Sequence, residues 1–165
     1  MPRQIQFLMT LRMSHRRTFS PPNNPISSYH LANLETLDVA VYRPTDTRDP
    51  HHWVIHIITP RRGSRTHQVH GDVGGRGYYV APPRFNIHSQ RARLHRVSIF
   101  VGRIPWYHLN RVRRMIQRWR VDNRSTTWNC QSWVMEIILE LRMRGWLAVR
   151  RRGLERLVRG REYWQ

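Results

Sequence analysis

Residues 126–145, TTWNCQSWVMEIILELRMRG, carry the clearest secondary-structure pattern in the chain. Apolar side chains recur there at intervals of three and four residues, which predicts a helix with one buried face. Ser125, Thr126 and Thr127 are candidate N-caps, and with Thr127 as the cap Cys130 would be the third helical residue. Gly145 lies just past the predicted end. The buried face would consist of Cys130, Trp133, Val134, Ile137, Ile138 and Leu141.

Two further helices are predicted on either side of this one. Pro105 suits a first helical position, and the apolar stripe that follows it is Leu109, Val112, Ile116 and Trp119. The Arg-rich tail from Arg150 contains a short helical pattern at Leu154, Leu157 and Val158. On the 126–145 helix, the face opposite the apolar stripe carries Glu136, Glu140 and Arg144, spaced for i,i+4 pairing.

The upstream half of the chain has the pattern of strands. HHWVIHII at 51–58 predicts a strand with His52, Val54, His56 and Ile58 on one face and Trp53, Ile55 and Ile57 on the other. Further strands are predicted at 36–42, 66–70, 78–80 and 95–101. Because the strands come first and the helices follow, the order favours an α+β fold, an antiparallel sheet packed against helices.

The chain length of 165 residues suits one domain. We expect residues 1–32, which are rich in Pro and Arg, to form a flexible basic lead-in, and residues 33–165 to form a single domain with an Arg-rich C-terminal tail. No apolar run approaches the roughly 20 residues of a membrane span. The expected location is intracellular, most simply cytoplasmic, and no cofactor is expected.

The charge is strongly basic, with 29 basic and 10 acidic residues and a formal net charge of +19. All of the basic residues are Arg, because the sequence contains no Lys. One interpretation is a module that binds nucleic acid or an anionic surface. The other is a GC-rich genome that replaces Lys by Arg throughout. Under either interpretation the charge predicts weak, non-specific binding of anions or nucleic acid.

The single cysteine, Cys130, cannot form an internal disulfide. A thiol at a helix start has a lowered pKa, because the backbone N–H groups and the helix dipole favour the thiolate. The alternative is that Cys130 packs in the core as a small apolar side chain. Six histidines lie in or next to the predicted strands and offer bases for a nucleophilic thiol: His51, His52, His56, His67, His70 and His95. No two of these histidines lie four residues apart on a predicted helix, and the chain has no second Cys, so zinc binding is not expected.

The pair HW at His52 and Trp53, followed by NC at Asn129 and Cys130, resembles the circularly permuted papain-like proteins of the NlpC-like superfamily. Lecithin:retinol acyltransferase and the related phospholipase/acyltransferases belong to this group. The pattern is most similar to small uncharacterised fungal proteins with an HW strand and a Cys-Gln-x-Trp helix. This chain departs from the family pattern after the cysteine, where Gln131 and Ser132 replace Glu-His.

The resemblance implies that Cys130 is a nucleophile and His52 its base, with His70 or Gln68 as the orienting group. It implies a cysteine-dependent hydrolase or acyltransferase that acts on an amide, ester or thioester through an acyl-thioester intermediate. A basic binding module, or a catalytically inactive interaction protein of the same fold, is the alternative. The substrate, an acyl compound or a peptide, is not indicated by the sequence.

Overall fold

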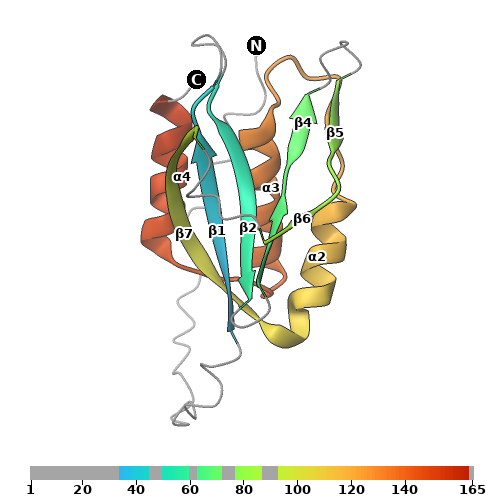
Figure 1. Ribbon diagram of the computed structural model, residues 1–165, viewed down its shortest axis with the longest axis vertical. Helices are drawn as coiled ribbons and strands as arrows, with labels where there is room; N and C mark the ends of the chain where they lie inside the picture. The colour runs from blue at the N-terminus through green and yellow to red at the C-terminus, as the bar shows by residue number, and fades with distance from the viewer. Residues whose placement is uncertain (1–33, 45–49, 60–62, 72–76, 87–92, 164–165) are drawn as a thin grey trace, which may run out of the picture.

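The computed structural model describes residues 34–44, 50–59, 63–71, 77–86 and 93–163 (Figure 1). The predicted α+β class is confirmed, since an antiparallel sheet of six strands in the order β6-β3-β2-β1-β7-β8 packs against helices. The strands of this sheet are β1 (Leu34–Tyr42), β2 (His52–Thr59), β3 (Gly63–His67), β6 (Arg84–Phe85), β7 (His95–Pro105) and β8 (Ala148–Val149). A second sheet pairs β4 (Val69–Gly71) with β5 (Tyr78–Val80). The helices are η3 (Trp106–His108), α2 (Leu109–Gln117), α3 (Cys130–Met143) and α4 (Arg151–Tyr163).

The core lies between one face of the large sheet and the helices. On the core face of β1 and β2, Val39 and Ile55 pair across the two strands and both are fully buried. β2 is buried on both faces, because Val54 and His56 on the opposite face are buried as well. In Figure 1, α3 and α4 lie on the far side of the sheet. Their contribution to the core includes Trp133, Val134, Ile137, Ile138, Leu141 and Leu157, while α2 adds Leu109, Val112 and Ile116.

The strand predicted at 66–70 is two strands. β3 pairs with β2 from Gly63 to His67, whereas β4 leaves the large sheet to pair with β5. The break falls at Gln68, whose carbonyl accepts a hydrogen bond from the Ala81 backbone N–H at 3.0 Å. Gln68 therefore belongs to neither strand, and this junction positions it for the site at the start of β2.

Other boundaries differ from the prediction for local reasons. β7 continues to Pro105, so this proline ends a strand instead of starting a helix, and α2 begins only at Leu109 after one 3-10 turn. Two short strands, β6 and β8, were not predicted, because two residues show no alternation.

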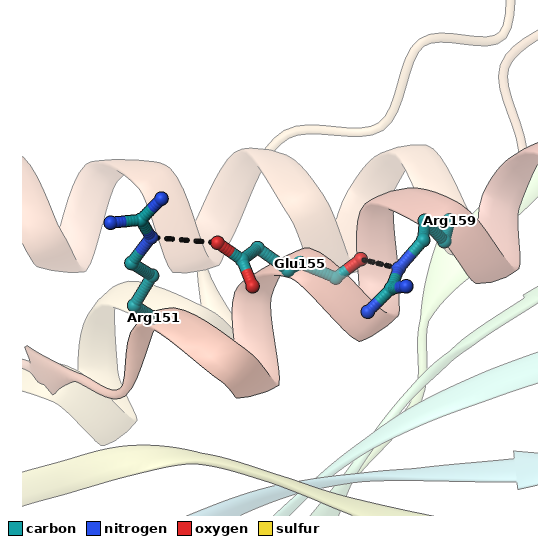
Figure 2. A network of polar contacts seen from close by, with 3 residues as sticks. All are labelled: Arg151, Glu155 and Arg159. Atoms are coloured by element: carbon teal, nitrogen blue, oxygen red, sulfur yellow. Dashed lines mark hydrogen bonds and ion pairs between the residues drawn. The ribbon is translucent and has the colours of Figure 1, made fainter.

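The Arg-rich tail forms a longer helix than predicted, Arg151–Tyr163. Its Leu157 is fully buried in the core, and Gly153 fits against β7 where a Cβ atom would overlap the Phe100 carbonyl. On its outer side Arg151 donates to the Glu155 carboxylate at 2.7 Å, and Arg159 donates to the Glu155 carbonyl at 3.4 Å (Figure 2). These arginines therefore belong to a solvated helix face.

The lead-in predicted for residues 1–32 lies outside the described residues. Within the described ranges, none of the helices has the length and apolar character needed to cross a membrane.

Candidate functional site

Cys130 is the first residue of α3, and Asn129 is the N-cap. The Asn129 side-chain oxygen accepts from the backbone N–H groups of Gln131 at 2.9 Å and Ser132 at 3.3 Å. The three candidate N-caps, Ser125, Thr126 and Thr127, are wrong, because Asn129 caps the helix while Ser125 and Thr127 hydrogen-bond to each other before it. Asn directly before the helix is among the most favoured N-caps, and this preference was the available sequence signal.

The thiol of Cys130 meets β2 at the edge of the strand, where the strand begins. Its sulfur lies 3.8 Å from the carbonyl oxygen of His51, and the backbone N–H of Trp53 also points to it. The register of β2 with β3 starts only at Ile55, so the edge of the preceding residues is open to α3. Figure 1 shows β2 and α3 beginning at the same end of the sheet. The two backbone groups that contact the sulfur belong to the residues on either side of His52.

Gln131 strengthens the same junction and was not singled out as a site residue from the sequence. Its side-chain Nε2 donates to the His51 carbonyl at 3.1 Å, and the residue is fully buried. Its Oε1 is buried without a hydrogen-bond partner among the described residues. From the sequence alone, a glutamine next to the cysteine does not indicate a role, because the strand that its buried amide contacts is not known.

The protonation state of Cys130 differs from the helix-start prediction. Burial raises the pKa of the thiol above its ordinary value, and the backbone N–H groups of Trp53, Gln131 and Cys130 itself act in the opposite direction without overcoming it. At rest the group is therefore a neutral thiol, consistent with its position as a donor toward the His51 carbonyl. Reaction as a nucleophile would require a base to remove its proton.

His52 is held by Gln68. His52 Nε2 and Gln68 Oε1 are 3.2 Å apart. Because an amide oxygen only accepts, Nε2 carries the proton and neutral His52 has its free lone pair on Nδ1. Burial lowers the pKa of His52, the hydrogen bond that its Nε2 donates to Gln68 raises it, and the nearby His70 lowers it again. The net shift is below the ordinary value. Neutral His52 is thus the stable form at neutral pH.

His70 contacts His52 in a different way. The two rings stack with their centroids 5.9 Å apart, and Tyr79 lies at the same distance on the other side of His70. Tyr42 continues the row, at 6.4 Å from His52 and 5.8 Å from His95. Of the two orienting groups left open by the sequence, Gln68 makes the hydrogen bond and His70 makes the ring contact.

His56 and His67 lie further along the large sheet, on β2 and β3. His56 is buried on β2, where its neighbours in the ladder are Asp38 and Thr66. His67 is buried, and burial together with the charges of two arginines lowers its pKa to about 4, so it is neutral. In the part of the chain that the structure describes, no group of three or more His, Cys, Asp or Glu residues is arranged to hold a metal ion.

The segment that leads into Cys130 is fixed by Glu136. Its carboxylate accepts from Trp119 Nε1 at 3.1 Å and from Trp128 Nε1 at 2.8 Å. Trp128 also packs its ring against Tyr78 of β5, at 5.2 Å. The predicted exposed pairing of Glu136 is therefore wrong, since two indoles bind its carboxylate, while the pairing of Glu140 with Arg144 is confirmed at 2.6 Å.

A protein-family model matches residues 37–148, more than half of the chain. The chain belongs to the DUF6540 family, a family of unknown function. No curated protein and no solved structure matches the chain. The span matched in this DUF6540 protein runs from β1 to β8 and includes His52, Gln68, His70 and Cys130.

Proposed function

We propose that this DUF6540 protein is a cysteine-dependent hydrolase or acyltransferase in which Cys130 is the nucleophile, His52 the base and Gln68 the orienting group. One observation carries the proposal. The sulfur contacts the backbone on both sides of His52, and the imidazole of the same residue is oriented by Gln68. A nucleophile, a base and a group that orients the base are the three parts that thiol catalysis requires.

The proposed reaction begins with a neutral Cys130 thiol and a neutral His52 imidazole. As the Cys130 sulfur attacks the substrate carbonyl carbon, His52 takes the thiol proton, so that charge develops only along the reaction path. When the bond to the leaving oxygen, nitrogen or sulfur breaks, His52 returns that proton to the leaving group, and an acyl-thioester remains on Cys130. Water or an acceptor alcohol or amine then attacks the thioester, giving up its proton to restore the thiol.

The start of α3 supplies donors for the developing oxyanion. Cys130 is the first helical residue, so its backbone N–H has no partner within the helix. Asn129 satisfies the next two N–H groups, at Gln131 and Ser132, and thereby keeps the first turn in place. We assign the Cys130 N–H as an oxyanion donor.

We further propose that the domain is a permuted papain-like one. Support comes from the chain order, with the base on β2 and the nucleophile on the later helix α3, and from the contact between the two starts. The Cys-Gln-x-Trp pattern also has a structural reason here, since the Gln131 side chain hydrogen-bonds to the His51 carbonyl and Trp133 is fully buried in the core.

Acyl-enzyme trapping tests this function. Incubation with p-nitrophenyl acetate and quenching in acid should place one acetyl group on Cys130, detected by intact mass and peptide mapping. Cys130→Ala should carry no acetyl group and release no p-nitrophenol above the uncatalysed rate. Undiminished release from Cys130→Ala would show that the cysteine is not the nucleophile.

A further inference from the structure

Two arginines lie at the end of the sheet where the candidate site is found. The backbone pairing places Tyr42 beside both His52 and His95, so the residues next to them in sequence, Arg43 and Arg96, follow from adjacent strands. Both arginine side chains are exposed. The end of the sheet that holds the thiol therefore also carries two accessible guanidinium groups.

Arg96 is connected to the thiol through His51. Its NH1 donates to His51 Nε2 at 2.9 Å, and the carbonyl of the same His51 contacts the Cys130 sulfur at 3.8 Å. One residue thus separates the guanidinium from the sulfur. The Arg96 guanidinium and the Cys130 thiol therefore contact the same residue, His51, directly before β2.

The positive charge there acts on the histidines. Burial lowers the pKa of His51 first, and the charges of Arg96 and Arg43 lower it further. Burial also lowers the pKa of His70, and the exposed Arg84 adds to that shift. His51 and His70 are therefore neutral at neutral pH, and Arg43, Arg84 and Arg96 contribute positive charge near them.

We propose that the substrate of Cys130 carries a negative charge, on a carboxylate or phosphate group, that Arg43 and Arg96 bind beside the thiol. This rests on the proposed function, because it names the substrate class of the same site. The planar guanidinium matches carboxylate and phosphate oxygens in a two-point contact. Arg96 also donates to the His51 ring, which ties its guanidinium to the segment at the start of β2.

Alkylation of Cys130 by a charged and a neutral reagent tests this inference. Iodoacetate and iodoacetamide undergo the same displacement, in which a C–S bond forms and iodide leaves, but only iodoacetate is anionic. Because the chain has a single cysteine, the reaction reports on one site. Relative to a free thiol in the same buffer, we expect the native protein to favour iodoacetate about threefold, the order of two Coulomb interactions in water screened by physiological salt.

The arginine variants show where that preference comes from. Arg43→Gln and Arg96→Gln should each reduce the iodoacetate preference about twofold, and Arg43→Lys and Arg96→Lys should retain it. Arg111→Gln, an exposed position on α2 with the same change in net charge, is the matched control and should leave the preference unchanged. Circular dichroism of each variant checks that it is folded, because unfolded chains would react with the ratio of a free thiol.

The outcomes separate this inference from the proposed function. A ratio equal to that of the free thiol, or an equal fall in Arg111→Gln, would overturn the anionic substrate while Cys130 remained a reactive nucleophile. If neither reagent modified native Cys130 before denaturation, both the inference and the proposed function would be wrong. Roughly physiological salt, with a Debye length of about 8 Å, screens the charge on the rest of the molecule during the measurement.

Discussion

Replacing His52 by alanine is expected to slow the alkylation of native Cys130 by iodoacetamide about 100-fold at pH 7, the lower end of what a positioned base contributes. The reason is the state of the thiol, whose pKa burial holds above its ordinary value, so that little thiolate forms without a base. The measurement is the pseudo-first-order rate of labelling, followed by intact mass. Labelling in denaturant should be equal for both proteins.

His95→Ala is the control for this experiment. His95 also lies at the end of the sheet beside Tyr42, but its ring hydrogen-bonds to Ser98 at 3.0 Å, whereas Gln68 hydrogen-bonds to His52. Its replacement should leave the labelling rate unchanged, whereas Gln68→Ala should slow labelling by less than His52→Ala does. Equal rates in the native protein and His52→Ala would remove His52 from the mechanism.

Glu136→Ala is expected to lower the free energy of unfolding by about 3 kcal/mol, because two hydrogen bonds to a charged acceptor disappear and two indole N–H groups lose their partner. Trp119 and Trp128 donate these bonds, and Trp128 lies two residues before Cys130. Guanidinium denaturation monitored by tryptophan fluorescence measures the loss. Glu136→Gln retains an acceptor oxygen and should lose less.

A matched control lies one turn further along the same helix. Glu140 pairs with Arg144 at 2.6 Å on a partly solvated surface, so Glu140→Ala should cost less than about 1 kcal/mol. If the two alanine variants lost equal stability, the indole contacts would contribute no more than a surface ion pair. The structural account of Glu136 would then be wrong.

The sequence was sufficient for the elements whose signals are local. Alternation predicted β1, β2 and most of β7, and the apolar period together with Gly145 predicted α3 to within a residue or two at its end. The Gly145 φ of +68° is the left-handed conformation that favours glycine after a helix. Local patterns also predicted the starts of β2 and α3 to within a few residues, while the roles of His52 and Cys130 stay predictions.

What the sequence did not predict depends on contacts between distant segments. The break between β3 and β4 at Gln68 arises from the pairing of β4 with β5, which no local pattern encodes. Glu136 has the spacing of a surface pair, yet it binds tryptophans from outside its own helix. The raised thiol pKa follows from burial against β2, which competes with the helix-start effect and exceeds it.

The pH dependence of Cys130 alkylation, compared between the native protein and His52→Ala, tests the central claim most directly. Burial lowers the pKa of His52 from 6.5, so its free base persists below that pH and the native rate should fall only as the pH drops through this lowered value. His52→Ala should instead show a rate that rises with pH toward the thiol pKa, which is raised from 9.0. The account predicts these two different profiles. A native profile that followed that of His52→Ala, with reactivity appearing only near or above pH 9, would contradict it.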